Sequence, residues 1–69
     1  MEYKMKYRNA EVLFQKMGNI WYIFSEIEDD VIYSALPKGV DPRDTKVELF
    51  EIIDIHNEKV AKRRHDLTV

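Results

Sequence analysis

AEVLFQKMGNIWYIFSEIEDDVIYSAL, residues 10–36, carries the clearest strand and turn signals of this chain. It holds three apolar runs, separated first by Gly18-Asn19 and then by the acidic cluster Glu28-Asp29-Asp30. β-Branched and aromatic residues dominate these runs, and such residues favour strands. The stretch therefore predicts an antiparallel meander of three strands over residues 10–36.

Gly18-Asn19 predicts the turn of the first hairpin. Glycine at the first central position suits a two-residue type II′ turn. Counting outward from that turn pairs Met17 with Ile20, then Leu13 with Phe24, and finally Glu11 with Glu26. A competing interpretation makes residues 10–17 a short helix, capped by Asn9 and ended by Gly18. The strand-forming residues on both sides of the turn favour the hairpin.

The register divides the hairpin into two faces, because successive side chains of a strand point to opposite sides. The cleaner apolar face is assigned to the core and carries Val12, Phe14, Trp21, Ile23 and Ile27. The other face carries a second apolar group, made of Leu13, Met17, Ile20, Tyr22 and Phe24. Neither face of this hairpin is plainly polar.

The register of the third strand, VIYSAL, stays open at this point. A three-residue loop places Val31, Tyr33 and Ala35 on the core face, whereas a two-residue loop places Ile32, Ser34 and Leu36 there. The preceding acidic cluster lacks the spaced carboxylates and the glycine of a calcium loop. A solvated turn is therefore favoured over a metal site.

A single amphipathic helix is expected after the loop 37–44, over residues 45–63, with a tail at 64–69. Asp41-Pro42 offers an N-cap followed by a first-turn proline, and Thr45 offers a capping box with Glu48. With a rotation of 100° per residue about the helix axis, the apolar residues fall on one face of the predicted helix, and Phe50 lies at its flank. That face consists of Leu49, Ile52, Ile53, His56 and Val60. The predicted fold class is α+β, in the order β-β-β-α, with the helix on one sheet face.

Composition places the 69 residues in one small globular domain, near the size at which a single core is marginally stable. The chain is 45% hydrophobic and 35% charged, with a formal charge of −2 and no cysteine. Disulfides and thiolate metal sites are thereby excluded, and no strong overall field recruits nucleic acid. The charged N-terminus does not resemble a signal peptide, and the longest apolar run is IWYIF. We expect a cytoplasmic protein without a membrane segment.

Two basic clusters carry the alternative interpretation of the chain. Residues 2–9 alternate in type, and residues 1–9 form either an extended segment or a frayed terminus, with lysines that resist edge-to-edge pairing. The same alternation puts a basic stripe beside aromatic residues, a pattern that can follow a nucleic-acid backbone. The candidate nucleic-acid contacts are Lys4, Lys6, Arg8, Lys59, Lys62, Arg63 and Arg64.

His56 is the one chemically notable residue of the predicted helix face. It could act as a general base, yet neither Ser25 nor Ser34 has a nucleophile-elbow motif around it. We therefore interpret His56 as a structural residue at the rim of the core or at a subunit boundary. The sequence shows no catalytic constellation, so we expect neither enzymatic activity nor a cofactor.

The second apolar face of the hairpin gives the leading functional hypothesis. One helix covers one face of the sheet, and the sequence offers no second helix to cover the other. An exposed apolar patch of this kind typically marks an interaction site. The sequence predicts a small non-catalytic interaction or regulatory protein, acting as a homodimer or binding another protein through Leu13, Met17, Ile20, Tyr22 and Phe24. The alternative is a nucleic-acid-binding module.

Overall fold

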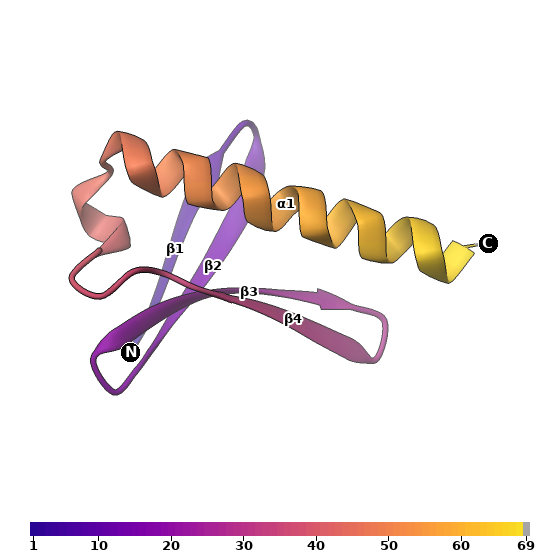
Figure 1. The fold of residues 1–69 in the computed structure, drawn as a ribbon, viewed down its shortest axis with the longest axis horizontal. Coiled ribbons are helices and arrows are strands. Elements are labelled where there is room, and N and C mark those ends of the chain that lie inside the picture. Colours follow the sequence, from indigo (N-terminus) through magenta and orange to yellow (C-terminus); the bar gives the residue numbers. More distant parts are fainter. Residues whose placement is uncertain (69) are drawn as a thin grey trace.

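The computed structural model describes the backbone of residues 1–68 and the side chains of residues 1–66. It contains a four-stranded antiparallel sheet in the order β1-β2-β3-β4, followed by a short 3-10 turn and one long helix (Figure 1). The α+β class and the C-terminal helix agree with the prediction from the sequence. The elements are β1 Glu2–Tyr7, β2 Ala10–Met17, β3 Ile20–Ile27, β4 Asp30–Ala35, η1 Pro42–Asp44 and α1 Val47–Thr68.

The prediction of three strands was wrong, because the N-terminal segment forms a fourth. β1 pairs with β2 along its whole length, from Glu2–Gln15 to Tyr7–Ala10. Arg8 and Asn9 both have positive φ angles, 53° and 62°, as a two-residue type I′ turn requires. The inward side of β1 packs on the core through Tyr3, Met5 and Tyr7. These contacts hold β1 in the sheet, although its charged residues are also typical of a frayed terminus.

The first predicted hairpin is confirmed as the pair β2–β3. Its ladder runs from Met17–Ile20 to Leu13–Phe24 in the register counted from the sequence. Gly18 has a φ of 65°, the left-handed value that a type II′ turn needs at its first central residue. The alternative helix over residues 10–17 is wrong. The expected pairing of Glu11 with Glu26 is absent, since the two hairpins diverge beyond Leu13 (Figure 1).

The register of β4 is that of a two-residue loop. Ile27 pairs with Asp30, so that Glu28 and Asp29 form the turn, and Phe24 pairs with Tyr33 farther along. Leu36 is consequently buried, and Val31 and Tyr33 face the side of the sheet opposite the helix. Of the two alternatives left open by the sequence, the one with Ile32, Ser34 and Leu36 on the core face is correct.

The helix begins later and ends later than predicted. The carboxylate of Asp41 accepts a hydrogen bond from the backbone N–H of Arg43 at 2.9 Å, which caps the 3-10 turn η1 rather than α1. Hydrogen bonds from Arg43 lower the pKa of Asp41 to about 2. Thr45 has a left-handed φ of 45° and cannot serve as the extended N-cap of the helix. Neither glycine nor proline follows Arg63, so α1 continues to Thr68.

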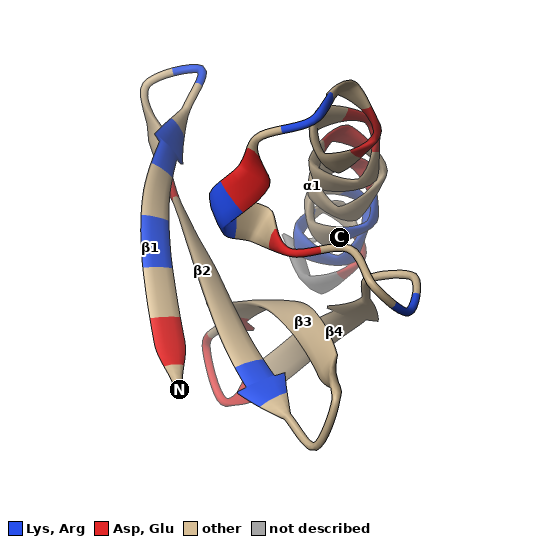
Figure 2. Ribbon diagram, turned by 90° about the vertical axis from the view of Figure 1, so that its left-hand side faces the viewer, with Lys and Arg blue, Asp and Glu red and all other residues tan. Residues whose placement is uncertain are grey.

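The core lies between α1 and the inward sides of both hairpins. Figures 1 and 2 show α1 lying in the angle between the β1–β2 and β3–β4 hairpins. The helix buries Leu49, Ile53, His56 and Val60, four of the five residues predicted for its apolar face. The sheet buries Val12, Phe14, Trp21, Ile23 and Ile27, and Leu36 is buried directly after β4. Among the described residues, no helix combines the length and the apolar character needed to cross a lipid bilayer.

Polar contacts from exposed and half-buried residues attach the helix to both hairpins. On the β1–β2 side, the Tyr7 hydroxyl donates to Asp54 at 3.2 Å, and the Tyr7 ring stacks on Phe50. On the β3–β4 side, Arg63 donates to the carboxylate of Asp30 at 2.7 Å. Lys59 also reaches the backbone carbonyl of Tyr33 at 3.4 Å. The helix is thus attached to both hairpins.

Candidate functional site

The open face, as we call the sheet surface opposite α1, holds all five residues that the sequence proposed for a partner surface. The ladder places Leu13 beside Phe24 and Met17 beside Ile20, with their side chains directed away from the core. Met17 is 45% exposed, whereas Leu13, Ile20, Tyr22 and Phe24 are half-buried. Cross-strand neighbours cover one another in this way on a pleated surface. The patch is therefore continuous but partly self-covered.

Strand β4 extends the patch with two residues that the sequence did not assign. Tyr33 and Val31 are 47% and 41% exposed. The Tyr33 ring lies 6.2 Å from that of Phe24 and 6.4 Å, edge-on, from that of Tyr22. These are favourable separations for aromatic pairs. The only sequence signal for Tyr33 was the period-two pattern of VIYSAL, which could not be used without the loop length.

Charged residues of both signs border the open face. Lys4 lies opposite Leu13, and Lys6 lies opposite Glu11, on the outer strand β1. Glu2 occupies the same strand, and Figure 2 shows acidic and basic positions alternating along it with uncharged ones. A border that contains both signs can face a copy of itself without a net repulsion. The open face thus has an apolar centre and a mixed polar rim, the usual anatomy of a protein interface.

The proposed nucleic-acid residues do not form one surface. Lys4 and Lys6 lie on β1 at one edge of the sheet, while Lys59 and Arg63 contact β4 at the other edge. Arg8 is drawn to the helix, with its guanidinium over the Tyr7 ring and 3.7 Å from Asp54. Two of the seven cations are thus paired with carboxylates, and the two clusters are separated by the width of the sheet.

His56 joins two strands through residues far apart in the sequence. Its Nε2 lies 2.9 Å from the Ser25 hydroxyl on β3, and its Nδ1 lies 2.7 Å from the Ser34 hydroxyl on β4. The imidazole is 1% exposed. Burial, aided by the positive charge of Lys59, lowers the pKa of His56 below its ordinary value of 6.5. In the neutral ring one nitrogen donates and the other accepts, which satisfies both contacts.

The Ser25–His56–Ser34 cluster has the geometry of a structural clamp. Both ring nitrogens are engaged by hydroxyl groups, so no carboxylate orients the imidazole as it would in a catalytic triad. The cluster ties β3 and β4 to α1 in the interior. Within the described part of the chain, no three His, Asp or Glu side chains gather closely enough to hold a metal ion.

Comparison with known proteins gave no match to a family model, a curated protein or a solved structure.

Proposed function

We propose that this chain is a small non-catalytic protein-interaction module that forms a homodimer through its open face. The observation that carries the proposal is the group of aromatic rings formed by Tyr22, Phe24 and Tyr33 on a sheet surface that no element of the described residues covers. Aromatic residues at the centre of a patch and charges at its rim distinguish interfaces from the remaining protein surface.

A second copy is favoured as the occupant by the size and charge of the surface. Burying on the order of 300 Å² of apolar area per subunit, at about 25 cal/mol per Å², contributes about 7 kcal/mol per subunit before the cost of association. A 69-residue domain also gains stability when a dimer enlarges its core. Because the rim contains both signs, two identical faces can meet around a two-fold axis.

Sedimentation velocity tests the proposal on the wild-type chain and on a Tyr22→Glu, Phe24→Glu double variant. We expect the wild type to be a dimer at concentrations of about 10 to 100 μM, given the area above. The double variant should be a folded monomer, because two carboxylates on each face cannot be buried without partners. Ile55→Glu serves as the matched control, since Ile55 is 64% exposed on α1, away from the open face. A wild-type monomer, or a double variant that remains dimeric, contradicts the proposal.

A further inference from the structure

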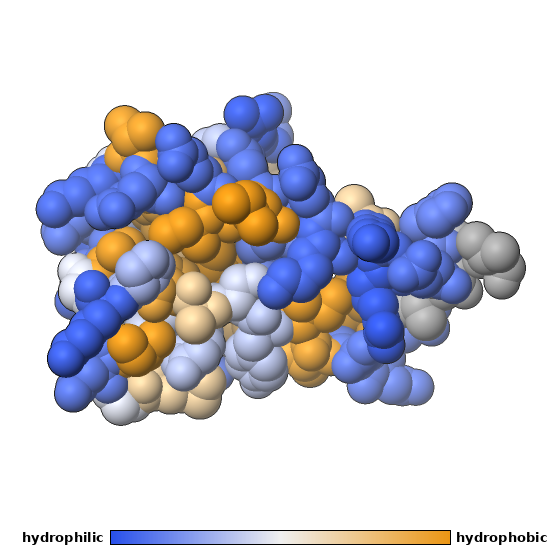
Figure 3. All heavy atoms as spheres, viewed as in Figure 1, coloured by the Kyte–Doolittle hydropathy of each residue, from blue (hydrophilic) through white to orange (hydrophobic). Residues whose placement is uncertain are grey.

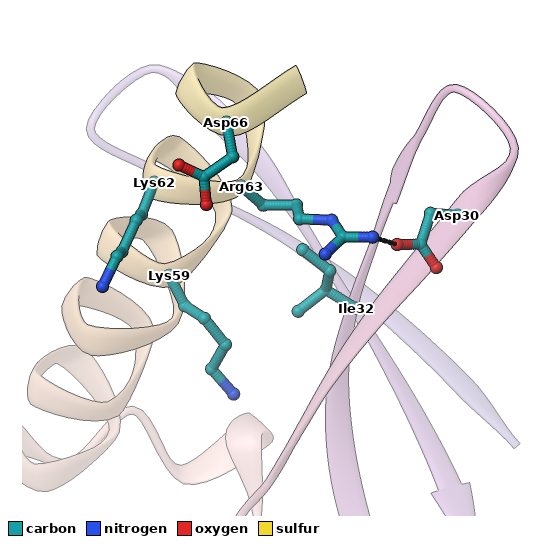
Figure 4. Close-up of a pocket in the computed structure, with 6 residues that line it drawn as sticks. All are labelled: Asp30, Ile32, Lys59, Lys62, Arg63 and Asp66. Atoms are coloured by element: carbon teal, nitrogen blue, oxygen red, sulfur yellow. Dashed lines mark hydrogen bonds and ion pairs between the residues drawn. The ribbon is translucent and has the colours of Figure 1, made fainter. Parts of the chain in front are cut away.

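A groove runs between the edge strand β4 and the helix α1, on the side of the sheet away from the open face. Its first half, about 370 Å³, is lined mainly by apolar groups, among them Ala35, Pro37, Ile52 and Ile55. Its second half, about 290 Å³, is lined by Asp30, Ile32, Lys59, Lys62, Arg63 and Asp66 (Figure 4). Lys59 borders both halves, so the two hollows are neighbours along β4.

The backbone of β4 offers hydrogen-bonding groups to this groove. In an antiparallel ladder every second residue exchanges hydrogen bonds with its neighbour strand, and the residues between direct theirs outward. Asp30 flanks the two-residue turn and pairs with Ile27, and such a flanking pair is hydrogen-bonded. At the other end, the backbone N–H of Leu36 donates to the carbonyl of Trp21 at 2.8 Å. The even-numbered residues of β4 therefore bond to β3. The outward set is therefore Val31, Tyr33 and Ala35. The contact of Lys59 with the carbonyl of Tyr33 confirms the outward direction at that residue.

The two edges of the sheet differ in their protection against strand pairing. β1 carries Lys4 and Lys6, and lysines on an edge strand discourage the addition of another strand. β4 has no charged residue after Asp30, and its next residues are VIYSA. The ammonium of Lys59 meets the outward backbone of this edge through a long hydrogen bond of 3.4 Å, and Arg63 reaches the Asp30 side chain at the start of β4. A flexible ammonium group of this kind can be displaced by an incoming backbone N–H.

The two halves of the groove differ in chemistry. Ile55 is 64% exposed beside the first half, and Figure 3 shows apolar side chains gathered along α1 on this face. In the second half, Arg63 reaches across Ile32 to pair with Asp30 (Figure 4). Lys62 has no ion-pair partner among the described side chains. Three cations against two carboxylates leave this half with an excess of positive charge.

A second copy of the chain does not suit this edge. Antiparallel pairing of the three outward residues with themselves places the two-fold axis close to Tyr33. Lys59 lies beside that axis, because its ammonium contacts the carbonyl of Tyr33. The two copies would therefore bring like charges together at the centre of the contact, which is unfavourable. A carboxylate at this position on a different chain would instead be attracted.

We propose that the groove binds an extended segment of a partner protein, which adds to β4 as a fifth, antiparallel strand. Strand addition of this type uses backbone hydrogen bonds for affinity and alternate side chains for specificity. Side chains of the segment opposite Leu36 and Ser34 would meet the apolar half of the groove, and the one opposite Ile32 would meet Lys59 and Lys62. The segment therefore has the pattern apolar-x-apolar-x-acidic, read from its N-terminus. The carboxylate of the segment pairs with the ammonium of Lys59. A backbone N–H of the segment then replaces that ammonium as the donor to the carbonyl of Tyr33.

A library of random eight-residue peptides displayed on phage tests this proposal. Selection on the wild-type protein should enrich the pattern apolar-x-apolar-x-acidic. Selection on a Lys59→Glu variant should replace the acidic residue by a basic one at the same position. The enriched peptide, made synthetically, should also shift the backbone amide resonances of Val31, Tyr33 and Ala35 in the wild-type protein.

Ala35→Pro removes one outward N–H without removing a hydrogen bond of the ladder, as proline allows at a sheet edge. We expect it to weaken binding of the synthetic peptide about tenfold, as the loss of a well-formed hydrogen bond does. Ala35→Thr, which keeps the N–H, should bind as the wild type does. If Ala35→Pro fails to fold, Val31→Pro replaces it. The absence of an enriched pattern, equal binding to a folded proline variant, or unmoved β4 amides would overturn the proposal. If the wild type and Ala35→Thr self-associate and the proline variant does not, the edge binds a second copy of the chain. That result would overturn the proposal as well.

Discussion

The hydroxyl of Ser34 lies 2.7 Å from Nδ1 of His56, which joins the edge strand β4 to the middle of the helix α1. The opposite ring nitrogen contacts Ser25 on the adjacent strand β3. Charging a buried imidazole costs desolvation energy, so this junction of three elements is most stable while the ring is neutral. The relation between Ser34 and His56 thus makes the stability of the fold sensitive to pH.

We expect the free energy of unfolding to fall as the pH is lowered from about 7 to 5. Burial lowers the pKa of His56 in the folded chain below 6.5, whereas the unfolded chain takes up a proton near 6.5. The contribution of neutral His56 is therefore complete above that value and is lost as the pH falls through the lower, folded-state pKa. Urea unfolding at a series of pH values measures this slope. His56→Gln should reduce it, and equal slopes in wild type and His56→Gln would refute the assignment.

Ser34→Ala should lower the free energy of unfolding by about 1 to 3 kcal/mol, because it leaves a buried ring nitrogen without a partner. In a His56→Phe background the same substitution should cost much less, since the nitrogen is no longer present. A thermodynamic cycle of the four proteins isolates the interaction. Equal costs of Ser34→Ala in the two backgrounds would show that the hydroxyl acts independently of His56.

Arg63→Ala should change the stability little, by about 0 to 1 kcal/mol. The Arg63 and Asp30 side chains are 50% and 47% exposed, so that solvent screens the ion pair between them. Denaturant unfolding at low and at high salt measures the effect, and the small loss should be smaller still at high salt. A loss of more than about 2 kcal/mol in the free energy of unfolding would indicate that the ion pair is much more shielded from solvent than its exposed fraction implies.

Gly18→Ala should lower the free energy of unfolding by about 1 kcal/mol. Space is available, since an added Cβ would meet no atom within 4 Å, but the φ of 65° strains any residue with a side chain. Asn19→Ala, in the same turn, is the control and should cost less. Equal losses in the two variants would show that the loss of stability does not come from the left-handed conformation of Gly18.

The sequence predicted the parts of this fold that depend on local signals. Gly18-Asn19 set the β2–β3 register correctly, because a two-residue turn leaves a single way to pair the strands. β1 was missed since its alternating lysines resemble a solvated end, while the contacts of Tyr7 with Phe50 and Asp54 that hold it span more than 40 residues. The acidic run Glu28-Asp29-Asp30 allowed two loop lengths, which concealed the place of Tyr33.

The candidate surfaces were predicted to a similar extent. Leu13, Met17, Ile20, Tyr22 and Phe24 share one face, as counted from the turn, because side-chain alternation is a local property. The partners of His56 could not be identified in the same way. Ser25 and Ser34 are 31 and 22 residues away from it, and only the packing of α1 across β3 and β4 brings them together.

An isotope-filtered nuclear Overhauser experiment decides whether two copies of the chain meet through their open faces. The sample mixes labelled with unlabelled wild-type chains, so that only contacts between different copies are recorded. We expect cross-peaks between copies from the rings of Tyr22, Phe24 and Tyr33, and their loss in the Tyr22→Glu, Phe24→Glu variant. Cross-peaks between copies that arise only from β1 or α1, or none at a concentration of about 1 mM, would contradict the proposed homodimer.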